Sequence, residues 1–62
     1  MPHVIVQMLE GRTTDQKKEL IEGITKVVSD TCKTAADNVS VAIFEVPRTN
    51  WGKAGVPMSE RK

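Results

Sequence analysis

The sequence predicts an α/β fold made of one β-α-β unit followed by a C-terminal turn or short hairpin. Three segments carry this prediction: an apolar run at residues 2–9, a segment with helical periodicity at residues 14–32, and a second apolar run at residues 39–46. Two strands joined through a helix favour a right-handed crossover, so the strands should be parallel. A length of 62 residues allows one domain, spanning residues 1–62.

The first strand alternates between two faces. One face is apolar without interruption and carries Val4, Val6 and Met8. His3 and Gln7 interrupt the other face. A histidine in a strand is more often a packed or exposed side chain than a catalytic group.

The helix follows a polar turn that contains a glycine. Thr13 and Gln16 have the spacing of a capping box, in which each side chain satisfies a backbone N–H group of the other residue. Apolar side chains then recur at intervals of three and four residues, as they do on one face of a helix. These residues are Leu20, Ile21, Ile24, Val27, Val28 and Cys32. We expect Cys32 to be an unreactive part of the core.

The second strand is apolar on both faces, which is typical of a strand that is buried on both sides. One helix covers only one face of a two-stranded sheet, so another copy of the chain should cover the second face. Self-association would also stabilise so small a chain, because a single core of this size rarely contributes more than about 3–5 kcal/mol. The only cysteine, Cys32, cannot form an internal disulfide.

The composition argues against several classes of function. Nine Lys and Arg residues against eight Asp and Glu residues leave a net charge of +1, which predicts no nucleic-acid partner. No run approaches the ~18 apolar residues of a membrane span, and no basic segment followed by an apolar run indicates a signal peptide. We therefore expect a cytoplasmic protein with no membrane partner. No cluster of Cys and His residues predicts a metal site.

Pro2 directly follows Met1, and an initiator methionine is normally removed ahead of a residue as small as proline. The mature chain would then begin with a secondary amine, whereas every other proline nitrogen is an amide. An α-amino group has an unperturbed pKa of about 8, and burial or a nearby cation lowers that pKa toward physiological pH. Pro2 is therefore a candidate general base. The alternative is that Pro2 only begins an edge strand.

Four features together resemble the 4-oxalocrotonate (2-hydroxymuconate) tautomerases, the short-chain members of the tautomerase superfamily. They are Pro2, the segment Leu9-Glu10-Gly11-Arg12, the β-α-β order and the segment Asn50-Trp51-Gly52. The resemblance covers nearly the whole chain, from Pro2 to about Gly55.

This resemblance implies an isomerase that interconverts enol and keto forms of 2-oxo acids, such as 2-hydroxymuconate and 2-oxo-3-hexenedioate, in aromatic hydrocarbon catabolism. It also implies that no metal or organic cofactor takes part. The assembly that it implies is a homohexamer, a trimer of dimers, with active sites at the subunit interfaces. Sequence patterns alone support only self-association.

By this resemblance Pro2 is the general base and Arg12 binds a substrate carboxylate. A guanidinium group pairs with a carboxylate through two parallel hydrogen bonds. A cation at a helix start faces the positive end of the helix dipole, which favours a functional role for Arg12 over a surface role. Trp51 corresponds to the family's aromatic residue that walls the pocket; the alternative is that it fills a subunit contact.

Ser40 departs from the family pattern, which has a second arginine near this position. In the family that arginine polarises the 2-oxo group, and a neutral hydroxyl is a weaker donor than a guanidinium. Either Arg48 or Lys53 takes over its role, or the dienolate is stabilised less well. We therefore expect lower activity toward 2-hydroxymuconate, or a different 2-oxo acid or enol as substrate.

Two other functions stay open at this point. One is hydration or dehalogenation of unsaturated acids, in which a protonated proline acts as an acid and a further carboxylate activates water. No carboxylate in the sequence is obviously placed for that task. The other is a non-catalytic interaction module whose subunits only assemble, in which case a Pro2→Ala substitution would change no activity.

Overall fold

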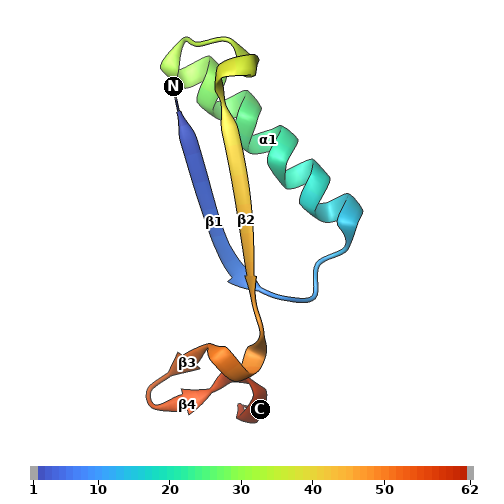
Figure 1. Ribbon diagram of the computed structural model, residues 1–62, viewed down its shortest axis with the longest axis vertical. Helices are drawn as coiled ribbons and strands as arrows, with labels where there is room; N and C mark the ends of the chain where they lie inside the picture. Colours follow the sequence, from blue (N-terminus) through green and yellow to red (C-terminus); the bar gives the residue numbers. More distant parts are fainter. Residues whose placement is uncertain (1, 62) are drawn as a thin grey trace.

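The computed structural model describes residues 2–61, so the predicted removal of Met1 and the position of Lys62 lie outside the described residues. The elements are β1 (His3–Leu9), α1 (Thr14–Cys32), η1 (Ala36–Asn38), β2 (Ser40–Val46), η2 (Arg48–Asn50), β3 (Gly52–Lys53), β4 (Val56–Pro57) and η3 (Met58–Glu60). Figure 1 shows β1 and β2 side by side with α1 against one face, and the β3–β4 hairpin beyond one end of the strands. The predicted β-α-β unit and C-terminal hairpin are both confirmed.

The two long strands are parallel, as predicted, and form the whole of one two-stranded sheet. Their register runs without a break from His3 opposite Ser40 to Leu9 opposite Val46. Both strands therefore begin at one end of the sheet and finish together at the other end.

Each strand begins one residue later than predicted. Pro2 precedes β1 because it has no N–H group to contribute to the ladder, although its carbonyl accepts a hydrogen bond from the Ser40 N–H group at 3.1 Å. Val39 precedes β2 because its N–H group donates instead to the Ala36 carbonyl of η1, at 3.0 Å.

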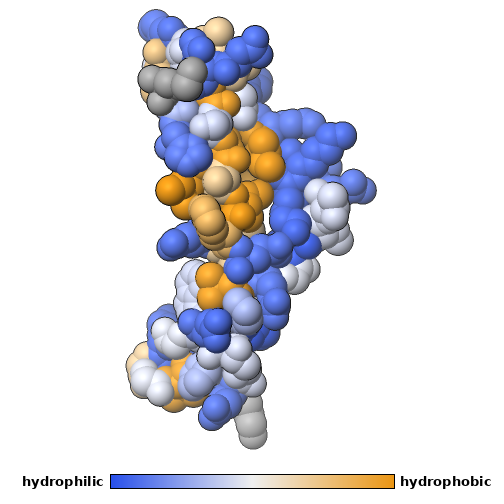
Figure 2. Space-filling model, viewed as in Figure 1, coloured by the Kyte–Doolittle hydropathy of each residue, from blue (hydrophilic) through white to orange (hydrophobic). Residues whose placement is uncertain are grey.

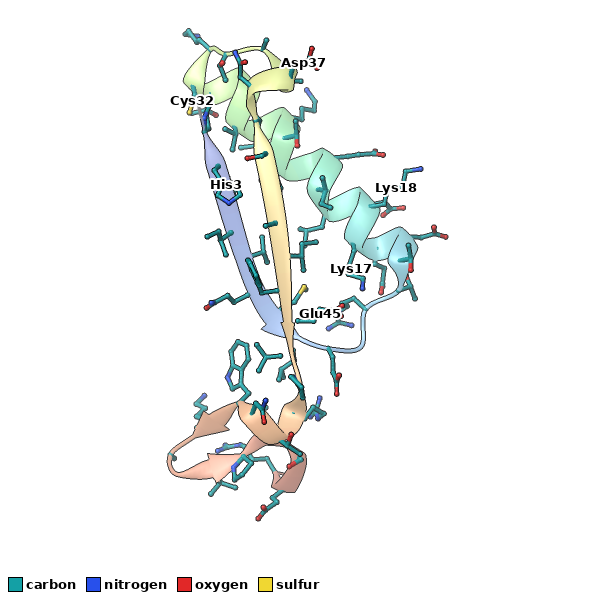
Figure 3. The ribbon with its side chains drawn as sticks, viewed as in Figure 1. His3, Lys17, Lys18, Cys32, Asp37 and Glu45 are labelled. Atoms are coloured by element: carbon teal, nitrogen blue, oxygen red, sulfur yellow. The ribbon has the colours of Figure 1, made fainter. Side chains whose placement is uncertain are left out.

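Helix α1 has the predicted bounds, and its predicted capping box is confirmed. The Thr13 hydroxyl accepts from the Gln16 N–H group at 3.0 Å, and the Thr13 N–H group donates to Gln16 Oε1 at 2.9 Å. The first turn of the helix is also attached to the sheet by an ion pair between Lys17 Nζ and Glu45 Oε1 at 2.7 Å, and Figure 3 shows these two side chains facing each other. This pair identifies the face of the sheet that α1 covers.

The opposite face of the sheet is open in the single chain. Its largest apolar side chains, Ile5 and Phe44, are 56% and 53% exposed. Figure 2 shows apolar surface gathered over the middle of the two strands. The prediction that one helix covers only one face is thus confirmed.

The apolar face of α1 is wider than the contact with the sheet. Leu20, Ile24 and Val28 are half-buried, whereas Val27 is 63% exposed and Cys32 is exposed as well. The prediction that Cys32 belongs to the core is therefore wrong for the single chain. The physical reason is that two strands are too narrow to cover the apolar residues of a helix that crosses them obliquely (Figure 1).

The chain is a thin, elongated slab. Its radius of gyration is 14.7 Å and its extents are 43 × 23 × 14 Å, whereas a compact domain of this length has a radius of gyration of about 11 Å. None of the described residues is fully buried. Among the described residues, no helix has the length and apolar character to cross a membrane.

Candidate active site

The parallel register divides the candidate site residues between the two ends of the sheet. Pro2 and Ser40 lie at the end where the strands begin, and Arg12, Arg48 and Trp51 follow the end where they finish. The seven residues of β1 separate the two groups, which at about 3.3 Å per residue amounts to roughly 23 Å. A single chain therefore does not bring Pro2 to Arg12.

The turn that carries Arg12 begins where β1 and β2 end together. The Glu10 N–H group donates to the Val46 carbonyl at 3.1 Å, which fixes the start of this turn to the end of β2. Gly11 then adopts a φ of 125°, and a Cβ atom there would meet nothing within 4 Å. The backbone conformation, and not a lack of space, accordingly favours glycine immediately before Arg12.

The segment after β2 positions Trp51 beside that turn. Pro47 is the N-cap of the short helix η2, and its carbonyl accepts a hydrogen bond from the Asn50 N–H group at 2.8 Å. The carbonyl of Trp51 accepts from the Met58 N–H group at 2.7 Å, at the end of the β3–β4 hairpin. The hairpin thus anchors the backbone that presents the indole ring.

These two segments enclose a hollow of about 540 Å³. The residues that line it are Gln7, Met8, Leu9, Glu10, Gly11, Arg12, Arg48 and Trp51. Neither Arg12 nor Arg48 forms an ion pair with another described residue. Trp51 remains 36% exposed. A hollow lined by two arginines, a tryptophan and apolar residues suits a small carboxylic acid, because guanidinium groups pair with carboxylate and apolar walls exclude water.

The structure therefore brings together three of the predicted substrate-binding residues, Arg12, Arg48 and Trp51. The sequence reasoning had not placed Gln7 and Met8 in this hollow. Gln7 gave one signal, since it is a polar interruption in an otherwise apolar strand. Met8 gave no such signal, because it shares an apolar strand face with Val6, as an ordinary core residue would.

At the other end of the sheet, Ser40 forms hydrogen bonds with Pro2 and with His3, the first residue of β1. Its N–H group donates to the Pro2 carbonyl at 3.1 Å, and its hydroxyl lies 2.6 Å from His3 Nδ1. The contact between His3 and Ser40 was not predicted, because it depends on a strand register that spans 37 residues of sequence.

Neither cation suggested as a replacement for an arginine at Ser40 reaches it within one chain. Arg48 lies in η2 and Lys53 in β3, both beyond the opposite end of the sheet. Lys53 does not line the hollow, and its carbonyl accepts a hydrogen bond from Arg61 Nη1 at 3.1 Å. Residues 2–61 contain no group of three or more His, Cys, Asp or Glu side chains that could hold a metal ion.

Known proteins match this chain over nearly its whole length, including the residues at both ends of the sheet. A family model described as tautomerase enzyme matches residues 2–61. A Listeria monocytogenes protein named "Probable tautomerase" is 45% identical over 60 residues, which cover 97% of this chain and 98% of the relative. The 2-hydroxymuconate tautomerase of Comamonas testosteroni is 43% identical over 60 residues, 97% of this chain and 95% of that protein. A heterohexamer 4-oxalocrotonate tautomerase from Chloroflexus aurantiacus is 34% identical, with a TM-score of 0.94 and full coverage of both chains.

Proposed function

Because this chain belongs to the tautomerase family of isomerases, we propose that it interconverts enol and keto forms of a 2-oxo acid with Pro2 as the general base. The hollow that joins Arg12, Arg48 and Trp51 is the observation that carries this proposal. A 2-hydroxydienoate such as 2-hydroxymuconate is the proposed substrate class, since relatives with that named activity are 43% identical over nearly their whole length.

The proposed reaction moves one proton and consumes none. The neutral amine of Pro2 takes the proton of the 2-hydroxyl group, the O–H electron pair forms the C=O bond, and the conjugated double bonds shift along the chain. The same proton then forms a C–H bond at the far carbon of the conjugated system, which leaves the amine neutral again. A general base accepts and returns a proton most efficiently when its pKa lies near the working pH.

The other site residues hold the acid and prepare the base. Arg12 and Arg48 pair with substrate carboxylate, and Trp51 keeps water from the reacting atoms. Cations and an apolar wall near Pro2 both lower the pKa of its amine, because each disfavours the protonated form. Activity should therefore rise as the pH increases through that pKa and fall below it, where the protonated amine cannot accept a proton.

This site is complete only when two copies of the chain meet. Pro2 and Arg12 of one chain are separated by the length of β1. In an antiparallel, two-fold arrangement of two chains, however, the end of one sheet where the strands begin lies beside the end of the partner's sheet where the strands finish. The open sheet face with Ile5 and Phe44 supplies apolar surface for such contacts. So does a hollow of about 430 Å³ on α1, lined by Glu19, Leu20, Gly23, Ile24, Val27 and Val28. We propose a homohexamer, a trimer of dimers, as the assembly.

Hydration of unsaturated acids is the second candidate, because one observation favours it. Glu10 lines the hollow beside Arg12, where a carboxylate could activate water. An assay with an unsaturated acid that has no enol group separates the two functions, since only a hydratase consumes it.

The test of the proposed function pairs an intact-mass measurement with an ultraviolet assay of 2-hydroxymuconate ketonisation. We expect a mass without Met1 and saturable turnover. A form with one uncleaved residue ahead of Pro2 should lose about 100-fold or more in kcat, because the amine becomes an amide and general base catalysis is lost. Unchanged size on gel filtration serves as the control for assembly. Full activity in a protein that retains Met1 would overturn the role of Pro2.

A further inference from the structure

His3 and Ser40 form a polar pair beside Pro2, at the end of the sheet where both strands begin. Their side chains lie 2.6 Å apart, between His3 Nδ1 and Ser40 Oγ, and both residues are exposed. Figure 3 shows His3 near the start of β1. The Ser40 N–H group also donates to the Pro2 carbonyl, so the pair is held at a fixed place relative to Pro2.

His3 and Ser40 lie on the open face of the sheet, which is otherwise mostly apolar. Because side chains alternate along a strand, His3 and Ser40 lie on the face opposite to Glu45, which pairs with Lys17 of α1. Ile5 and Phe44 occupy the same open face. A polar pair that becomes covered there needs a partner for each of its donors and acceptors.

The imidazole ring has one nitrogen left for such a partner. Ser40 occupies Nδ1, and no other side-chain hydrogen bond of His3 is formed within residues 2–61. When the Ser40 hydroxyl donates to Nδ1, the proton of a neutral imidazole must reside on Nε2. The pair then presents a single N–H donor that is free to bind an oxygen atom.

We propose that His3 is the residue that stabilises the oxyanion of the reaction, with Ser40 as its positioning residue. This inference rests on the proposed function. When the amine of Pro2 removes the 2-hydroxyl proton, negative charge develops on the 2-oxygen, and the Nε2–H group of His3 donates to that oxygen. The imidazole gives up no proton, so the proton still passes only from oxygen to Pro2 and then to carbon.

The geometry permits this contact although Pro2 and His3 are consecutive residues. Side chains at consecutive strand positions point to opposite faces, but the reacting nitrogen of Pro2 is a backbone atom at the end of the strand. The Cα atoms of the two residues are about 3.8 Å apart, less than the length of a six-carbon acid. One substrate can thus touch both the amine and the imidazole while Arg12 of a second copy holds its carboxylate.

The test measures ketonisation by His3 and Ser40 variants of the intact assembly. His3→Leu should lower kcat by about 100-fold with a smaller change in KM, because an oxyanion donor acts mainly in the transition state. His3→Gln should restore part of kcat, since its amide offers an N–H donor at a similar reach. Ser40→Ala should lower kcat by about tenfold, and Ser40→Thr should restore it.

The matched control is Asn38→Ala, which removes another exposed side-chain hydrogen bond, from Asn38 Nδ2 to Thr34 Oγ1 at 3.2 Å. We expect it to leave kcat within twofold. An NMR titration with the saturated acid 2-oxohexanedioate adds a signal that should not change on binding if His3 has only a structural role. The Nε2–H proton of His3 should be visible and should shift on binding in the wild type, and Ser40→Ala should weaken this signal.

The outcomes separate the two proposals. If the wild type is active and the kcat of His3→Leu lies within twofold of the wild-type value, the role of His3 is overturned and the proposed function stays intact. A wild type without any enol turnover overturns both. A neutral His3 imidazole protonated on Nδ1 when 2-oxohexanedioate is bound would also contradict the assigned donor.

Discussion

At the scale of single residues, the two ends of the sheet carry different chemistry. Arg12 and Arg48 supply cations that no described carboxylate neutralises through an ion pair, and they share a hollow with Trp51. Pro2, the proposed base, lies at the opposite end of the sheet from both of these arginines. The residues proposed for anion binding and for proton transfer thus belong to separate regions of one polypeptide, and under the proposed function they meet only between copies.

Arg12→Lys should raise KM for a dicarboxylate substrate about tenfold or more and lower kcat less. A lysine keeps the positive charge but cannot form two parallel hydrogen bonds to a carboxylate. Steady-state kinetics of ketonisation measure both constants. Arg61→Lys is the control, because Arg61 lies outside the hollow and donates to the Lys53 carbonyl; an equal rise in KM for both variants would contradict the assignment.

At the scale of elements, the start of α1 determines where Arg12 lies. The capping box between Thr13 and Gln16 begins one residue after Arg12, so the start of the helix is continuous with the turn that carries Arg12. Local patterns were enough to predict this helix and its cap, because both depend on residues three apart in the sequence. They did not predict the ion pair between Lys17 and Glu45, which are 28 residues apart.

Thr13→Ala should destabilise the protein by about 1 kcal/mol, since it removes the side-chain acceptor for the Gln16 N–H group. Denaturant unfolding at one fixed protein concentration measures the change, because self-association contributes to apparent stability. Thr14→Ala, at the next position, which is also exposed, should change stability by less than about 0.5 kcal/mol. Equal effects of the two substitutions would show that the cap does not contribute.

At the scale of the whole molecule, the absence of any fully buried residue among those described is the dominant feature. The sequence predicted part of this feature, an uncovered face of the sheet, because a second strand that is apolar on both faces needs more cover than one helix provides. The sequence also singled out Pro2 by its position directly after Met1, and Arg12 and Trp51 mainly by the resemblance to a known family. Their division between opposite ends of the sheet follows from the order of the strands and their parallel pairing. The contact between His3 and Ser40, in contrast, depends on the strand register, which only the folded chain reveals.

The most direct measurement of a site shared between copies is complementation by two inactive variants. One carries an uncleaved residue ahead of Pro2, and the other carries Arg12→Ala. Each should be inactive alone, whereas a one-to-one mixture that is unfolded and refolded together should regain about a quarter of wild-type activity. That fraction follows because one random pairing in four joins an intact Pro2 to an intact Arg12. A co-refolded mixture that forms full-sized oligomers yet stays inactive would contradict the account.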